Sequence, residues 1–258
     1  MVRQLYIAFL LFVYPLSFIL GVCAARFEPY YYKDSVKFSY TLPISVSNPI
    51  SNSSVVELKI RPPLGMTKPK VREFEITPFS KVVEVFTFHG EQYYPEIFSG
   101  WTEGTSTPSL SDIGYSVPGI ERNLAGLNKA IAWVEDQIEY KGFQSEALTL
   151  QELHKLRQGD CTEHALLLEA LLQETGFRTV KAVDGFYLPE EASRRVSAAN
   201  AHSWVVVYFE DQWLVVDALY RTIKPISSEY IVMNSLVEGA SVPLMTINSE
   251  APIIVKYL

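Results

Sequence analysis

The sequence contains few cysteines and no cluster of positive charge. Two cysteines, Cys23 and Cys161, occur in 258 residues, far below the density of a small secreted scaffold held by disulfides. Lysine and arginine total 22 against 29 acidic residues. No basic run interrupts that balance, so the chain lacks the electrostatic footprint of a nucleic-acid-binding protein. We set nucleic acid aside as a partner and expect stability to come from packing.

An uncharged stretch runs from Leu5 to Ala25. Arg3 lies just before it, and it ends in the small residues Ala24 and Ala25. This pattern predicts a signal peptide over residues 1–24 and therefore an exported protein, periplasmic or extracellular. A retained membrane anchor is the alternative, because about 20 apolar residues suffice to span hydrocarbon. Membrane attachment would then run through residues 5–25.

The segment from Phe27 to about Val117 is rich in β-branched and aromatic residues. Period-two alternation predicts strands of an antiparallel sheet. It is seen in Val36, Phe38, Tyr40 and Leu42, in Val56, Leu58 and Ile60, and in the run from Lys81 to Phe88. We expect an all-β, sandwich-like domain with its linker over residues 27–118. Its last part, Gly100 to Pro118, has the composition of a linker or a covering loop.

Helical signals begin after this segment. Apolar residues at steps of three and four predict an amphipathic helix over Ile120 to Tyr140. Thr149 and Glu152 form a capping box, which starts a short helix ending near Gly159. Asp160 is placed to cap a third helix. The buried face of that helix is expected to contain Ala165, Leu168, Leu171 and Leu172.

Three strand-like runs follow the helices, at 179–186, 203–209 and 212–218. Only Glu210 and Asp211 separate the last two runs, which predicts a hairpin with a two-residue turn. Helices followed by antiparallel strands indicate an α+β domain rather than alternating βαβ units. We assign this domain to residues 119–258.

Cys161 falls at the first position of the third predicted helix. Unpaired N–H groups and the positive end of the helix dipole favour a thiolate there, and the same groups are placed to bind an oxyanion. If the signal peptide is removed, Cys161 is the only cysteine left. A buried structural thiol is the plain alternative, but an unpaired cysteine outside the cytosol invites oxidation and needs a reason.

A thiolate nucleophile needs a base, and later a proton donor, which a histidine can supply. His202 begins one strand of the predicted hairpin and Asp217 ends the other. With the turn at residues 210–211, these two residues are diagonal neighbours on one face, within reach of a carboxylate–imidazole hydrogen bond. The order Cys161, His202, Asp217 therefore predicts a catalytic triad.

These residues resemble the transglutaminase-like superfamily of papain-like cysteine enzymes. The resemblance is carried by Gly159-Asp160-Cys161-Thr162-Glu163-His164-Ala165, by Leu171-Leu172 with Gly176-Phe177-Arg178, and by Ala201-His202-Ser203-Trp204 with Trp213 and Asp217. It covers about residues 119 to 220. The β-rich segment ahead of it is similar to the domain that precedes this core in exported members.

The resemblance implies a papain-like transglutaminase core, with helices packed on an antiparallel sheet. It assigns Cys161 as the nucleophile, His202 as the general base and acid, and Asp217 as the residue that orients His202. The substrates implied are amide bonds of proteins or peptides, with water or an amine accepting the acyl group. We expect no cofactor, and no metal either, because this sequence has no recognisable counterpart of the acidic loop that binds calcium in larger animal relatives. Ser203 stands where members often have Ala. Some members also have a side-chain oxyanion donor. No motif in this sequence identifies that residue, and Tyr140, ahead of the cysteine helix, is a candidate for it.

Two alternatives stay open. The first is a non-catalytic transglutaminase-like module that binds or assembles an envelope or extracellular complex. The second is a zinc site made of Cys161, His164, His202 and Asp217, which are all acceptable ligand types. Its spacing lacks the tight pairs of ordinary zinc sites, and the position of Cys161 already has an explanation. The oligomeric state does not follow from the sequence.

Overall fold

The computed structural model describes residues 34–99, 109–142, 148–189, 194–237 and 243–258. The predicted signal peptide or anchor, including Cys23, lies outside the described residues, as does part of the predicted linker. Among the described residues, no helix combines the length and the apolar character needed to cross a bilayer.

The N-terminal half is built from antiparallel strands, as expected. Its strands are β1 (Ser35–Ser47), β2 (Ser54–Ile60), β3 (Lys70–Ile76) and β4 (Lys81–Tyr93), followed by the short helix α2 (Tyr94–Phe98). β1 pairs with β4 and β2 pairs with β3. Alternate residues of β1 and β2, such as Tyr40 and Leu58, are buried in one shared core. Two sheets that bury their inner faces against each other make a sandwich.

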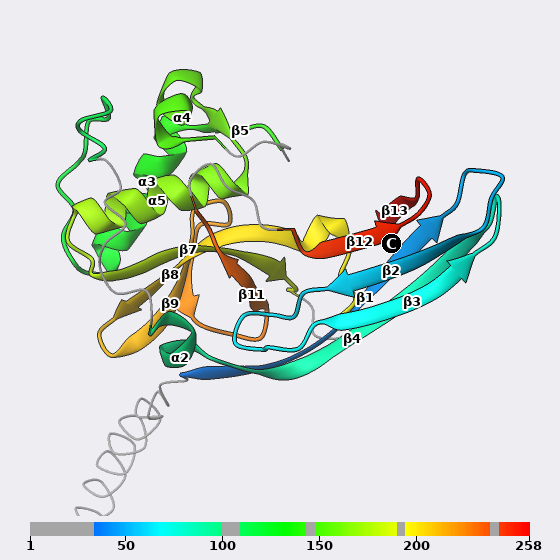
Figure 1. Cartoon of the computed structure of the whole chain (residues 1–258). Coiled ribbons are helices and arrows are strands. Elements are labelled where there is room, and N and C mark those ends of the chain that lie inside the picture. Colours follow the sequence, from blue (N-terminus) through cyan, green and yellow to red (C-terminus); the bar gives the residue numbers. More distant parts are fainter. Residues whose placement is uncertain (1–33, 100–108, 143–147, 190–193, 238–242) are drawn as a thin grey trace, which may run out of the picture. The chain divides into compact units, whose positions relative to one another are not determined.

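Each of these two sheets takes its third strand from the C-terminal end of the sequence. β12 (Met245–Ser249) pairs with β2, and β13 (Ile254–Tyr257) pairs with β1. In Figure 1 both strands, coloured red, lie beside blue strands of the N-terminal half. The domain boundary between residues 118 and 119 stays a prediction. With that boundary, β12 and β13 belong to the predicted domain at 119–258, although they pair with strands of the predicted β-rich domain at 27–118.

Three predicted helices are present, with somewhat different bounds. They are α3 (Leu124–Gln137), α4 (Leu150–Leu156) and α5 (Cys161–Glu174). α3 is shorter than predicted because the Asn123 side chain caps it by accepting from the Gly126 amide at 2.8 Å, and because Ile138 is already extended. The capping box at Thr149 and the cap at Asp160 are confirmed, and the Asp160 cap is itself part of a capping box with Glu163.

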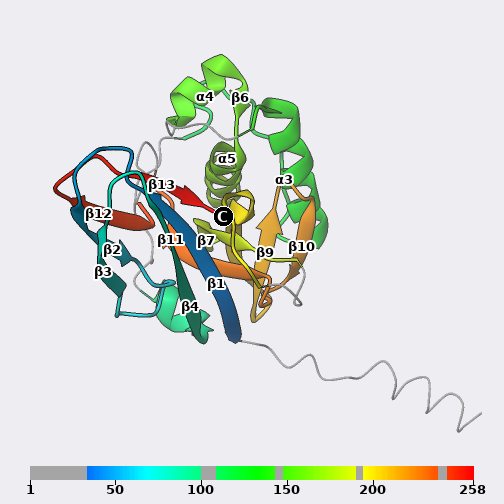
Figure 2. The same cartoon turned by 90° about the vertical axis from the view of Figure 1, so that its right-hand side faces the viewer.

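α5 is the most buried helix of the domain. Leu167, Leu168, Leu171 and Leu172 are fully buried, so the apolar face is wider than the predicted one. The reason is visible in Figures 1 and 2, where α5 lies between α3, α4 and the sheet beneath. Two short strands, β5 (Glu139–Tyr140) and β6 (Gln158–Gly159), form a parallel pair. β5 directly follows α3 and β6 directly precedes α5, so the pair joins the end of α3 to the start of α5.

The sheet under α5 has five antiparallel strands in the order β10-β9-β8-β7-β11. They are β7 (Thr179–Tyr187), β8 (Ala201–Phe209), β9 (Gln212–Asp217), β10 (Thr222–Pro225) and β11 (Tyr230–Ser235), with a 3-10 turn at Ala198–Asn200 before β8. Glu210 and Asp211 form the predicted turn, with φ of 49° and 59°, as a two-residue hairpin turn requires. Val205 lies opposite Val216, which is the predicted register.

Gly185 is a point of close approach between strands of this sheet. It lies on β7 between His202 and Val232. A Cβ atom at this position would lie 1.9 Å from the carbonyl oxygen of Ile231 and 2.9 Å from the Trp204 ring. Only glycine therefore allows the three strands to pair here.

We predict that Gly185→Ala destabilises the protein by about 1–3 kcal/mol, because backbone of β11 must shift to admit the methyl group. The free energy of unfolding from urea titrations measures this. Gly119→Ala is the control, since a Cβ there would meet no atom within 4 Å. Equal stability of the two variants would contradict the close packing at Gly185.

Candidate active site

Cys161 is the first residue of α5 and is partly exposed. The preceding Asp160 holds the turn around it. Its Oδ1 accepts from the Thr162 amide at 2.7 Å, and its own amide donates to Oε2 of Glu163 at 2.8 Å. A thiol at the first position of a capped helix faces the positive end of the helix dipole, which favours the thiolate.

The capping box also decides which N–H groups remain for an oxyanion. The amides of Thr162 and Glu163 both donate to the Asp160 side chain. The amide of Cys161 takes no part in the box, and a first-turn amide has no partner within the helix. The sequence predicted several first-turn donors, whereas the structure leaves the Cys161 amide as the one beside the thiol.

His202 and Asp217 meet as their register predicted. Nε2 of His202 lies 2.7 Å from Oδ2 of Asp217, and the two residues are 5% and 0% exposed. His202 is the second residue of β8, and Asp217 is the last residue of β9, on the strand beside it. Because Nε2 is engaged by the carboxylate, Nδ1 is the ring nitrogen left for Cys161.

Asp217 accepts three further hydrogen bonds. The Tyr230 hydroxyl donates to Oδ2 at 3.1 Å, and the amides of Leu219 and Tyr220 donate to Oδ1 at 3.0 and 3.1 Å. Burial, together with the Asp217 charge, raises the pKa of Tyr230, so its hydroxyl keeps the proton that it donates. These four donors hold the carboxylate in one orientation. Sequence reasoning missed Tyr230, which no motif marks.

Two opposing effects set the charge of His202. Burial lowers its pKa, but hydrogen bonds and negative charge from Asp217 and Cys161 outweigh burial and raise the pKa of His202 to about 9. The imidazole is therefore protonated at neutral pH. A protonated imidazole beside a thiol favours the thiolate form of that thiol, because the two opposite charges attract each other.

Aromatic rings enclose the imidazole. The ring of Trp204 stacks on it at a centroid distance of 6.0 Å, and the rings of Tyr220 and Tyr187 lie at 4.7 and 6.1 Å. Trp204 thus packs against the site, whereas Trp213, a member of the same hydrophobic cluster, packs on Phe98. The enclosure limits the contact of His202 with water, which strengthens its interaction with Asp217.

Ser203, the departure from the family pattern, has a contact of its own. Its hydroxyl lies 3.3 Å from the hydroxyl of Thr162. The contact joins the strand that carries His202 to the first turn of α5, which carries Cys161. An alanine at this position could not make it.

The zinc alternative finds no support. Nδ1 of His164 lies 2.7 Å from the carbonyl oxygen of Asp160. Cys161, His164, His202 and Asp217 are all described, and no three His, Cys, Asp or Glu residues among the described ones are grouped so that they could hold a metal ion.

Comparison with known proteins agrees with this geometry. Residues 115–218 match the family model of the transglutaminase-like superfamily. This part of the chain is a transglutaminase-like domain. The match contains Cys161, His202 and Asp217, and the fold around them is the α+β fold that the resemblance implied. The roles of the three residues stay a prediction.

Solved structures with a similar arrangement share little sequence with the chain. A candidate cysteine protease from Cytophaga hutchinsonii has 12% identity and a TM-score of 0.49, with 86% of this chain and 90% of that chain covered. LapG from Legionella pneumophila has 17% identity and a TM-score of 0.35, with 50% and 70% covered. An EGTA-treated form of LapG has 16% identity and the same TM-score. No curated protein matches the chain.

The raised pKa of His202 predicts a pH dependence of stability. An unfolded histidine titrates near pH 6.5, whereas folded His202 titrates near 9. The contribution of His202 is therefore complete below about pH 6.5 and is lost as the pH rises through about 9. Urea unfolding between about pH 6 and pH 9.5 should show the wild type losing more stability than His202→Gln. Parallel curves for the two proteins would contradict the assignment.

Proposed function

We propose that this chain is an exported thiol acyl-transfer enzyme that acts on amide bonds of protein or peptide substrates. The observation that carries the proposal is the buried 2.7 Å pair of His202 and Asp217 beside a thiol at a capped helix start. The transglutaminase-like domain at 115–218 supports enzyme chemistry of this kind. Export rests on the uncharged N-terminal segment of the sequence.

Each group has a defined part in the reaction. The Cys161 thiolate attacks the substrate carbonyl carbon, and the carbonyl electrons move to oxygen. The Cys161 amide donates to this oxyanion, with the Tyr140 hydroxyl as a second candidate donor. The tetrahedral intermediate collapses, the C–N bond breaks, and His202 gives its proton to the leaving amine. A thioester on Cys161 and a neutral His202 result.

The second half of the reaction reverses these roles. His202 takes a proton from the incoming acceptor, which attacks the thioester and regenerates the Cys161 thiolate. Water as the acceptor gives hydrolysis, and a lysine-type amine gives cross-linking. Both outcomes use the same three residues, so the acceptor is decided by the surface around the site. Analysis of products from peptides incubated with and without a primary amine separates them.

The reactivity of Cys161 tests the proposal before any substrate is known. Iodoacetamide should alkylate wild-type protein well below pH 7, because the His202 imidazolium stabilises the thiolate. In His202→Ala, this low-pH reaction should fall by at least about tenfold. Asp217→Asn should give a smaller loss, since it leaves the imidazole in place. Mass spectrometry of the Cys161 peptide against time measures all three rates.

Asp184→Asn is a matched control for the Asp217 variant, because Asp184 is a half-buried acid of the same sheet that interacts with Arg61 and Asn234 instead. Its alkylation profile should equal that of wild type. An alkylation rate that rises only near pH 8 to 9, and that is the same in wild type and His202→Ala, would refute the triad. It would favour the alternative of a non-catalytic binding or assembly module.

We expect no metal requirement, because the sequence contains no recognisable acidic loop of the kind that binds calcium in larger animal relatives. Prolonged chelation with EDTA should leave both the alkylation profile and any amidase activity unchanged. Loss of either, with recovery on adding back a divalent cation, would overturn this expectation.

A further inference from the structure

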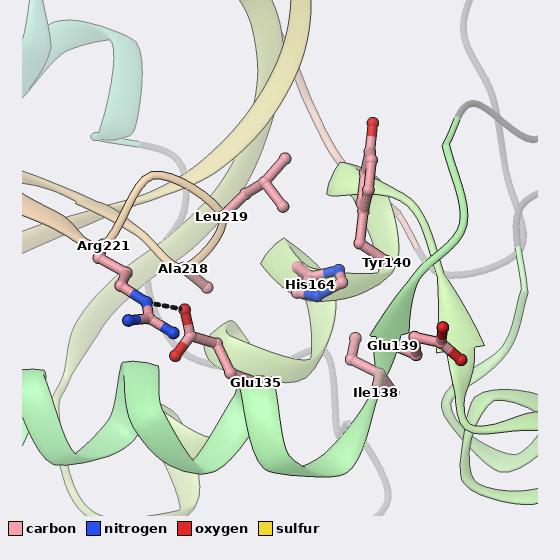
Figure 3. Close-up of a pocket in the computed structure, with 8 residues that line it drawn as sticks. All are labelled: Glu135, Ile138, Glu139, Tyr140, His164, Ala218, Leu219 and Arg221. Atoms are coloured by element: carbon pink, nitrogen blue, oxygen red, sulfur yellow. Dashed lines mark hydrogen bonds and ion pairs between the residues drawn. The ribbon is translucent and has the colours of Figure 1, made fainter.

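A pocket of about 250 Å³ opens beside the first turn of α5 (Figure 3). Ile138, Ala218 and Leu219 give it an apolar lining, and Glu135 and His164 give it polar groups. Neither of these polar residues has a part in the chemistry proposed above. The pocket therefore calls for a separate explanation.

The pocket adjoins the nucleophile. His164 is three residues after Cys161 on α5, and Ala218 directly follows Asp217. Tyr140, another lining residue, lies near enough to Cys161 for the thiol's charge to act with burial in raising the pKa of Tyr140. A substrate residue next to the attacked bond is thus within reach of the pocket.

His164 presents a hydrogen-bond acceptor to this space. Nδ1 lies 2.7 Å from the carbonyl oxygen of Asp160, and a carbonyl can only accept, so Nδ1 carries the proton. Burial lowers the pKa of His164, which leaves the ring neutral and Nε2 with a free lone pair. The residue is 4% exposed, and no described residue bonds to Nε2. Figure 3 shows the ring among the lining side chains.

The charges around the pocket favour a cation. Oε1 of Glu135 accepts from Nε of Arg221 at 2.6 Å, and the second carboxylate oxygen has no partner among the described residues. The Arg221 side chain is 76% exposed, against 26% for Glu135, so the guanidinium lies at the solvent edge and the carboxylate lies deeper. The negative charges of Asp160, Glu135 and Asp217 each raise the pKa of His164, against the larger effect of burial, which lowers it. The electrostatic potential at the ring is therefore negative.

We propose that this pocket holds a lysine-type side chain of the peptide substrate, next to the bond that Cys161 attacks. The inference rests on the proposed function. The methylene groups pack on Ile138, Ala218 and Leu219, and the ammonium group donates to His164 and Glu135. An acidic side chain could pair only with Arg221 at the solvent edge. Deeper in the pocket it would face Glu135 and a ring nitrogen that cannot donate, so the pocket disfavours it.

Three methanethiosulfonate reagents probe the preference at Cys161 without a known substrate. The 2-aminoethyl and n-propyl reagents have nearly the same shape and differ in charge, and the 2-sulfonatoethyl reagent is an anion. In each case the thiolate attacks sulfur, a disulfide forms and methanesulfinate leaves. Rates at about pH 7 are normalised to those of a small free thiol. We expect the aminoethyl reagent to react about fivefold faster than the propyl reagent, and the sulfonatoethyl reagent to react more slowly than both.

Variants separate the pocket from general electrostatics. Glu135→Gln and His164→Phe should bring the aminoethyl-to-propyl ratio close to one, whereas Arg221→Gln should raise it by removing the competing cation. Asp136→Asn is the matched control, because this exposed neighbour loses the same charge without lining the pocket. It should keep the wild-type ratio. Circular dichroism checks the fold of each variant.

The outcomes distinguish this inference from the function that it rests on. Rapid reaction at about pH 7 with an aminoethyl-to-propyl ratio near one would contradict the lysine subsite but not the proposed thiol enzyme. A ratio changed equally by Asp136→Asn and Glu135→Gln would have the same meaning. Reaction of all three reagents only at alkaline pH would overturn the proposed function, and the subsite with it.

Discussion

The hydrogen bond between His202 and Asp217 depends on the register of a single hairpin. Side chains alternate between the two faces of a strand, so a slip of one residue between β8 and β9 would place the imidazole and the carboxylate on opposite faces. The two-residue turn at Glu210 and Asp211 prevents that slip, although both residues adopt a positive φ that glycine or asparagine adopts more easily. The geometry of the site is thus decided at the far end of the hairpin.

The thiol reaches this pair because α5 is fixed on nearly all sides. Its leucines are buried against α3, α4 and the sheet, and the cap at Asp160 determines where the helix begins. The contact of Thr162 with Ser203 then joins the helix start to the strand of His202. A site assembled from rigid elements in this way needs no loop closure to bring its three side chains together.

Much of this arrangement could be predicted from the sequence, because it depends on local signals. The capping box at Asp160 marks the helix start, and two short runs around a polar turn mark the hairpin. Features made by tertiary contact could not be predicted. Tyr230 reaches Asp217 from β11, at the opposite edge of the sheet from β10. β3 was not predicted because most of its residues are exposed. Its sequence therefore lacks the alternation of apolar and polar residues that marks a strand with one buried face.

The return of β12 and β13 to the N-terminal sheets has a consequence for the order of folding during synthesis. Both sheets of the sandwich remain two-stranded until β12 and β13 have left the ribosome. The five-stranded sheet and the helices above it come from the intervening residues, and all of that segment emerges earlier. The transglutaminase-like domain can therefore fold while the sandwich beside it still lacks its final strands.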